Sequence, residues 1–222
     1  MAPRSVTRRL ESVARRLATC YGIPRRRLED PLDVLIETVL SQNTSDINSG
    51  RAFRALKAAF PSWPAVARAR RSTLARTIRS GGLARLKSAR ILSILAELRA
   101  RPGGYDLRPL RRLGPAAAEA SLRGLPGVGP KTRACVLLFG CGHAAFPVDT
   151  HVHRIVRRLG LVPQRTDAEA SHALLAPRVP AARALDLHLN LIRLGRELCR
   201  PRAPRCERCP LRRACAFARR AA

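Results

Sequence analysis

The sequence predicts an all-α protein, and three observations lead to this prediction. Apolar residues recur at three- and four-residue spacing in several stretches. No stretch shows the sustained alternation of apolar and polar residues that is typical of a β-strand. Proline and glycine separate the apolar stretches at short intervals. We therefore expect about ten short helices joined by loops of ordinary length.

Each expected helix combines a helical apolar pattern with a breaker beside it. In chain order, the patterns occupy residues 6–17, 34–40, 52–60, 83–98, 134–139 and 185–198. The breakers between them include Pro31, Pro61, Gly81-Gly82, Pro102, Pro126 and Pro163. The first helix is rich in Arg and amphipathic, as a mitochondrial targeting segment would be, but Glu11 favours an ordinary surface helix.

The charge of the chain points to a polyanionic partner. With 222 residues, the chain can bury one sizeable core or two small ones. Its net charge is +28, from 43 basic and 15 acidic residues, which is far more than solubility requires. A GC-rich coding bias explains why Arg replaces Lys almost everywhere, but it does not explain the excess of cations. Histone-like and ribosomal proteins are equally basic, so charge alone does not indicate an enzyme.

Four of the seven cysteines form one cluster near the end of the sequence. Cys199, Cys206, Cys209 and Cys215 follow the pattern C-x6-C-x2-C-x5-C, and Arg stands in every gap. Four thiolates in one short segment can hold an iron–sulfur cluster. Zinc is the alternative, but zinc ribbons use two close CxxC pairs, and here only one pair has that spacing, which favours iron–sulfur.

The remaining cysteines and the absence of targeting patterns lead to expectations about thiol state and cellular location. Cys135 and Cys141 are most simply small buried hydrophobes. The sequence has no secretory signal and no apolar transmembrane run, so we expect reduced thiols, no membrane association, and a cytoplasmic, nucleoid-associated protein.

The segment LPGVGPKTRAC, residues 125–135, predicts a tight turn between two helices. Gly127 and Gly129 are expected to adopt backbone angles that other residues avoid, and to let a DNA strand approach closely at Gly127, Val128 and Gly129. The helix that starts near Pro130 directs free N–H groups outward, and a phosphate is their natural ligand. A simple helical hairpin with a glycine turn is the alternative.

Two side chains near this turn have candidate chemical roles. Lys131 stands in the first turn of the following helix, where the helix dipole and other cations favour its neutral, nucleophilic form. Holding a phosphate is its other possible role, and the spacing alone leaves both open. Asp149 occupies the position of a helix N-cap. Its carboxylate could also stabilise a developing cation or relay protons.

Taken together, LPGVGPKT, VDTHVHRI and the cysteine pattern resemble the endonuclease III family of the helix–hairpin–helix DNA glycosylases. The resemblance extends from about Pro31 to Cys215. It implies that Lys131 attacks the sugar C1′ and forms a Schiff base, and that Asp149 helps to expel the base. It also implies that the four cysteines bind a [4Fe–4S] cluster. The damaged base would be flipped out and excised, and the strand would be nicked by β-elimination.

The same resemblance suggests which residues distort the DNA. The stretch LSQNTSD, residues 40–46, matches the place where typical family members insert a Gln. Aligned on Asp46, that position is Asn43, with Gln42 beside it. Leu83 matches a Leu that wedges into the duplex, and filling contacts of this kind offset the cost of unstacking. These segments also resemble the glycosylase domains of plant 5-methylcytosine demethylases. Oxidised pyrimidines are the default substrate.

The resemblance also predicts a two-domain helical DNA glycosylase fold. A six-helix domain at residues 30–145 would carry the helix–hairpin–helix at about 118–138. Residues 1–29 together with 146–222 would form the cluster domain, with the iron–sulfur loop at 199–215. DNA would lie between the domains, with Lys131 and Asp149 facing each other.

We expect a monomer that binds double-stranded DNA with damaged bases or abasic sites, acting as a bifunctional DNA glycosylase and AP lyase. The alternatives are a monofunctional mismatch or modified-pyrimidine glycosylase and a non-catalytic DNA-binding module.

Overall fold

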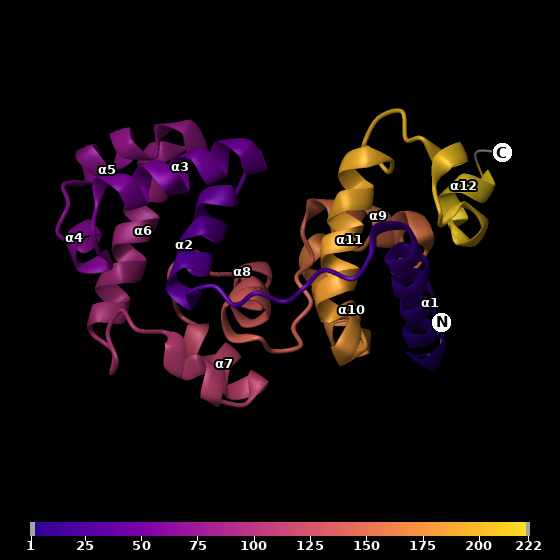
Figure 1. Ribbon diagram of the computed structural model, residues 1–222, viewed down its shortest axis with the longest axis horizontal. Helices are drawn as coiled ribbons and strands as arrows, with labels where there is room; N and C mark the ends of the chain where they lie inside the picture. The colour runs from indigo at the N-terminus through magenta and orange to yellow at the C-terminus, as the bar shows by residue number, and fades with distance from the viewer. Residues whose placement is uncertain (1–2, 221–222) are drawn as a thin grey trace. The chain divides into compact units, whose positions relative to one another are not determined.

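The computed structural model describes residues 3–220, and all regular secondary structure in this part of the chain is helical (Figure 1). Within residues 3–220 it has twelve α-helices, several 3₁₀ turns, one π-helical turn and no strand. The all-α prediction is confirmed. The helices outnumber the expected ten because short ones, such as α4 (Trp63–Ala67) and α12 (Ala216–Arg220), contain too few apolar positions to show a period. No helix in the described range is long and apolar enough to cross a membrane.

The chain divides into two compact units. One unit comprises Leu28–His143, and the other joins Met1–Arg27 to Ala144–Ala222. The limits expected from the sequence, residues 30 and 145, differ from these by two residues each. We call the two parts the hairpin unit (28–143) and the cysteine unit (1–27 with 144–222).

The hairpin unit contains seven of the described α-helices. After α2 (Pro31–Ser41) come α3 (Asp46–Ala59), α4, α5 (Arg71–Thr77), α6 (Ala84–Arg99), α7 (Pro115–Leu122) and α8 (Pro130–Cys135). Shorter elements are the 3₁₀ turns η1 (Arg79–Gly81) and η2 (Arg108–Arg112) and the π-helical turn η3 (Val136–Cys141), which continues α8 directly.

Helix α2 is the centre of the hairpin unit. It lies between α3 and α8, and most of its side chains are buried, so it is apolar on almost all sides (Figure 1). Asp30 caps its first turn by accepting hydrogen bonds from the backbone N–H groups of Leu32 and Asp33. A Cβ at Gly140 would lie 2.7 Å from the Cα of Pro31, so only glycine lets η3 approach the start of α2 this closely.

The cysteine unit has its own core. Its helices are α1 (Pro3–Tyr21), α9 (Thr150–Leu159), α10 (Ala168–Leu175), α11 (Ala184–Glu197) and α12. Helix α11 packs against α1 and α9, and their apolar faces form one buried cluster. Arg9 of α1 donates to the carbonyls of Leu159 (2.6 Å) and Gly160 (3.0 Å), where the end of α9 leaves carbonyls without helical partners.

Candidate DNA-binding and catalytic site

The predicted hairpin lies between α7 and α8. Gly127 has φ +70°, in the left-handed region that favours glycine, and so does Gly124 (φ +79°), a position that no sequence pattern had indicated. Gly129 has φ −80° and ψ −179°, an ordinary extended conformation, so the expectation of an unusual backbone angle at this position was wrong. A Cβ at Gly129 would meet no atom within 4 Å, so this side of the turn is open to a partner.

The turn is held in place by contacts from both helices. The side chain of Val128 is buried and its backbone N–H donates to the carbonyl of Leu125 at 3.1 Å, so the predicted contact of Val128 with DNA stays a prediction. Arg133 of α8 donates to the carbonyl of Val128 at 3.0 Å and forms an ion pair with Glu119 of α7 at 3.2 Å. The turn is therefore fixed before any ligand binds.

Lys131 lies in the first turn of α8, directly after this hairpin. Its side chain is partly exposed, and its Nζ makes no hydrogen bond or ion pair with any residue in the range 3–220. The two other lysines are both engaged, because Lys57 pairs with Asp33 and Lys87 is buried with two hydrogen bonds. Lys131 thus presents an amine that no acidic partner within the described residues neutralises.

Asp149 is the N-cap of α9, as its sequence position predicted. Its Oδ1 accepts a hydrogen bond of 2.7 Å from the backbone N–H of Val152. Three buried residues precede it, Phe146, Pro147 and Val148, and they fix where the carboxylate emerges from the core. Asp149 belongs to the cysteine unit and Lys131 to the hairpin unit, so the predicted approach of these two side chains stays a prediction.

The loop between α2 and α3 carries Gln42 and Asn43, the two residues expected at the position that inserts into the DNA. The amide of Gln42 is turned toward the hairpin, since its Oε1 accepts from Arg90 and its Nε2 donates to the carbonyl of Gly127 at 3.5 Å. The neighbouring Asn43 is exposed and has φ +53°. Asn43 is therefore the side chain available to a ligand, and Gln42 links its loop to the hairpin.

The expected wedge, Leu83, lies at the start of α6. It is 52% exposed and has φ +48°. Within residues 3–220 only three residues other than glycine have a positive φ, and Asn43 and Leu83 are two of them. Both candidate insertion residues are thus held in a conformation that costs free energy, which is common at functional sites.

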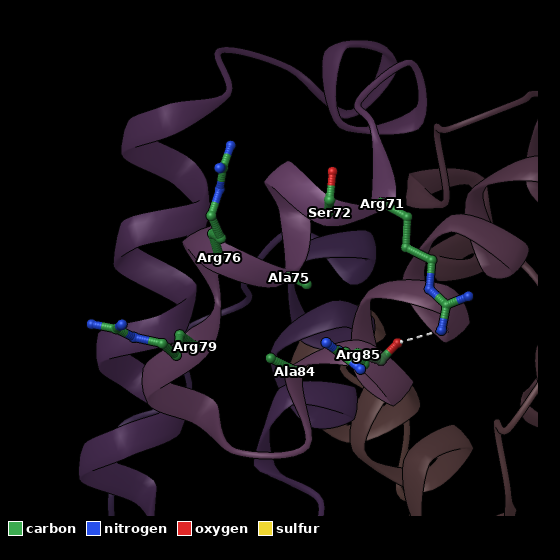
Figure 2. A pocket seen from close by; sticks show the side chains of 7 residues that line it. All are labelled: Arg71, Ser72, Ala75, Arg76, Arg79, Ala84 and Arg85. Carbon is green, nitrogen blue, oxygen red and sulfur yellow. Dashed lines mark hydrogen bonds between the residues drawn. The ribbon is translucent and has the colours of Figure 1, made fainter.

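A pocket lined by arginines lies beside the wedge, and no sequence pattern had indicated it. Its lining comes from α5, η1 and the start of α6, and consists of Arg71, Ser72, Ala75, Arg76, Arg79, Ala84 and Arg85. Figure 2 shows Ala75 and Ala84 between the arginines, and a hydrogen bond of 3.1 Å from Arg71 to the Arg85 carbonyl. No acidic residue lines this pocket, so it favours anions.

The four tail cysteines lie in one short segment after α11. Cys206 begins the 3₁₀ turn η6 (Cys206–Arg208), and all four side chains are partly buried and free of disulfide bonds. Burial raises the pKa of the Cys206 thiol, and the charges of Cys199 and Cys215 add to this effect. Burial also raises the pKa of Cys209 to about 11. The four thiols are thus close enough to influence one another, although within residues 3–220 no group of three or more ligand-type side chains is placed to hold one metal ion.

Two arginines of α9 bind the cysteine segment. The Nε of Arg154 donates to the carbonyl of Cys199 at 2.9 Å. Arg158 donates to the Sγ of Cys199 at 3.3 Å and to the carbonyl of Arg200 at 2.7 Å. In return, the Cys215 thiol donates to the carbonyl of Arg158 at 3.4 Å. The segment is therefore anchored to the helix that Asp149 caps.

Relatives with known names match this chain over most of its length. Endonuclease III of Thermotoga maritima is 38% identical over 212 residues, which are 95% of this chain and 94% of that protein. The Arabidopsis thaliana protein At3g47830, which bears the name of a DNA glycosylase, is 41% identical over 168 residues. This match covers 76% of the chain but 57% of the plant protein. The DNA glycosylase/AP lyase ROS1 of Arabidopsis thaliana is much longer, and the chain spans 12% of it at 32% identity.

A solved structure and a family model point to the same family as these relatives. The solved structure of a non-covalent Endonuclease III–DNA complex has a TM-score of 0.81 and 25% sequence identity, and the match covers 100% of this chain and 98% of that one. Residues 36–180 match the model of the HhH-GPD superfamily of base excision DNA repair proteins. The helix–hairpin–helix around Gly127, the candidate DNA-binding loops and the cysteine tail thus occur together in a chain that belongs to the HhH-GPD superfamily, in its endonuclease III family.

Proposed function

We propose that this protein is a bifunctional DNA glycosylase and AP lyase that removes oxidised pyrimidines from double-stranded DNA. Membership in the endonuclease III family makes it a base excision repair DNA glycosylase. The observation that supports the additional lyase step is Lys131, whose Nζ has no partner within residues 3–220 and which directly follows the hairpin turn. A primary amine can form an imine with the sugar, which a guanidinium cannot do.

The proposed reaction uses two side chains. The amine of Lys131 attacks C1′ of the flipped nucleotide and gives up a proton, and the bond between C1′ and the base breaks. The base leaves with its bonding electrons, and Asp149 stabilises the positive charge that develops on the sugar. The sugar ring then opens as the bond between C1′ and O4′ breaks and O4′ takes up a proton, which leaves a Schiff base between Lys131 and C1′. This Schiff base makes the C2′ proton acidic. Loss of this proton expels the 3′ phosphate by β-elimination, and hydrolysis then releases Lys131.

We propose that the hairpin unit supplies the DNA-binding surface. The turn at Gly127 and Gly129 would bind a backbone phosphate, because it is open at Gly129, where α8 begins. The arginines of the pocket at α5, η1 and α6 would neutralise further phosphates beside Leu83. Asn43 and Leu83 would enter the duplex and fill the space that the flipped nucleotide leaves.

The tail cysteines fit a [4Fe–4S] cluster. They supply four thiols without disulfide bonds, and three of them, Cys199, Cys209 and Cys215, pack against the core of the cysteine unit. In such a cluster the four thiolates would be the ligands that the protein supplies to the irons. Arg158 beside the Sγ of Cys199 would offset part of the negative charge. When bound, the cluster would cross-link the tail and order its arginines.

Borohydride trapping tests the proposed chemistry. The protein is incubated with a duplex that contains an abasic site, in the presence of borohydride, and the covalent adduct is measured. We expect an adduct with the wild-type protein and with Lys57→Ala, and none with Lys131→Ala. A wild-type protein that excises bases without nicking the strand would instead be a monofunctional glycosylase. Absence of any trapped adduct would refute the lyase step.

Two further measurements test the substrate and the cofactor. Duplexes that each carry one lesion, namely thymine glycol, dihydrouracil, mismatched uracil or thymine, or 5-methylcytosine, are compared under single-turnover conditions. We expect the oxidised pyrimidines to be excised fastest. The protein purified without oxygen should contain iron and be coloured, and Cys206→Ser should lose both properties. A colourless protein that contains zinc would overturn the cluster assignment.

A further inference from the structure

Lys87 is a buried lysine that takes no part in the proposed reaction. It lies in the first turn of α6 and is only 2% exposed. Within residues 3–220 it forms no ion pair with a carboxylate. Burial lowers the pKa of this ammonium group. Burying a lysine without a carboxylate partner costs free energy. We therefore expect Lys87 to have a function that offsets this cost.

The hydrogen bonds of Lys87 join two loops that are far apart in the sequence. Its Nζ donates to the carbonyl of Leu40 at 2.7 Å and to the carbonyl of Gly81 at 2.7 Å. Leu40 lies in the last turn of α2, where backbone carbonyls have no helical partner. Gly81 is the last residue of η1. One side chain therefore holds the ends of both elements.

Each acceptor lies next to a candidate insertion residue. Leu40 precedes Asn43 by three positions, and Gly81 precedes Leu83 by two. The backbone N–H of Lys87 also donates to the carbonyl of Leu83 at 2.9 Å, so Lys87 binds the wedge residue itself as well as the residue two positions before it. The wedge loop also lies close to α3, because a Cβ at Gly81 would come within 3.1 Å of the Cβ of Ala52.

Both insertion residues need such support because their backbones are strained. Asn43 has φ +53° and Leu83 has φ +48°, in a region that residues with a side chain rarely adopt. A strained backbone persists only where its surroundings impose it. In the unconstrained chain, the loop would relax and the side chain would change direction. Lys87 is the group that is bonded to the backbone beside both strained positions.

We propose that Lys87 is a positioning residue that locks the Asn43 loop and the Leu83 loop into one preformed unit for opening the DNA duplex. The inference rests on the proposed function, since it assigns to these loops the task of replacing a flipped nucleotide. A preformed pair enters the duplex without the entropic cost of ordering two separate loops during base flipping. Lys87 takes no part in the chemistry at the sugar, because its amine is buried and committed to two carbonyls.

The first test replaces Lys87 with Met, which keeps the length of the side chain and removes the hydrogen bonds. Lys57→Met is the matched control, because Lys57 is an exposed lysine of the same unit. Base flipping is followed by the fluorescence of 2-aminopurine placed beside the lesion, and excision is followed under single-turnover conditions. We expect Lys87→Met to slow both steps in duplex DNA by about tenfold to a hundredfold. Trapping on a single-stranded abasic site, where no duplex has to be opened, should be unchanged.

A double-mutant cycle separates positioning from a general loss of stability. If Lys87 acts through the wedge, Lys87→Met should cost little in a Leu83→Gly background, where the wedge and its strain are both absent. An equal loss in both backgrounds would overturn the proposal, as would an unchanged flipping rate in Lys87→Met. Thermal unfolding of each variant is measured in parallel. If Lys87→Met does not fold, Lys87→Gln, which retains an N–H donor, is used in the same cycle.

The outcomes also distinguish this inference from the proposed function. A wild-type protein that neither excises a lesion nor forms a trapped adduct would refute the proposed function. An active wild-type protein that Lys87→Met matches in flipping and excision would refute only the role of Lys87.

Discussion

Gly127→Ala is expected to destabilise the hairpin unit by about 2–3 kcal/mol. A non-glycine residue in the left-handed conformation costs about 1–2 kcal/mol, and Gly127 has φ +70°. The added Cβ would also lie 2.2 Å from the Nε of Arg90 and 2.5 Å from its Cδ. Arg90 would have to move and would lose its hydrogen bond to Gln42, which is worth about 1 kcal/mol.

The matched control for this change lies two residues away. Gly129 has φ −80°, and a Cβ there would meet no atom within 4 Å. Gly129→Ala should therefore stabilise the protein slightly, by about 0.4–1 kcal/mol, because it reduces the entropy of the unfolded chain. Both variants place a methyl group on the turn, so both should weaken DNA binding. Only the change at Gly127 should destabilise the fold.

Thermal unfolding followed by circular dichroism measures the difference. For a chain of this length, 1 kcal/mol shifts the Tm by about 2–4 °C, so Gly127→Ala should lower it by about 4–12 °C. In an Arg90→Ala background the steric overlap is absent, and Gly127→Ala should then cost only the conformational part, about 1–2 kcal/mol. Equal Tm values for the two glycine variants would contradict this prediction, because they would show that neither φ nor Arg90 decides the loss of stability.

Three further predictions concern other parts of the site. Asp149→Asn should keep the N-cap, because Asn caps as well as Asp, so the Tm should change by no more than about 1 °C. Excision of lesions should be lost in this variant. An active variant would contradict the catalytic role of Asp149. The pKa of Lys87 in the folded protein lies below its ordinary value of 10.5. At a pH between these two pKa values, the unfolded chain binds more protons than the folded chain. The free energy of unfolding should therefore rise with pH over this range. Denaturant titrations should show this rise in the wild-type protein and not in Lys87→Met. Replacing Arg76 and Arg79 with Gln should reduce the slope of log Kd against log salt by about 0.9 for each lost phosphate contact, whereas Arg99→Gln, at the far end of α6, should leave it unchanged.

Local features of the fold could be predicted from the sequence. The apolar spacing predicted helices that include α1, α2 and α6, because a helix of two turns or more repeats its buried face within a short window. The N-cap at Asp149 also depends on a contact only three residues away. The hairpin turn, marked by Gly127, is local in the same way. Helices of five residues, such as α4, were missed because so short a segment has no period to detect.

Contacts between distant segments could not be predicted in this way. The hydrogen bond between Gln42 and Gly127 joins residues 85 positions apart, and it decides that Gln42 faces the hairpin while Asn43 is exposed. The arginine pocket likewise depends on how α5, η1 and α6 pack together. Residue type alone also misjudged Gly129, since a glycine in a turn can have an ordinary backbone conformation.

The helical class, the family and the candidate chemistry of Lys131, Asp149 and the tail cysteines could be predicted from the amino-acid sequence, because each of these depends on residue types at short and regular spacing. The surroundings of these groups became visible when the chain was folded. The tertiary structure placed Lys87 against a carbonyl 47 residues away and beside two strained loops. The physical reason is that burial and long-range hydrogen bonds arise when distant segments pack, so a residue such as Lys87 has no local pattern that reveals its role.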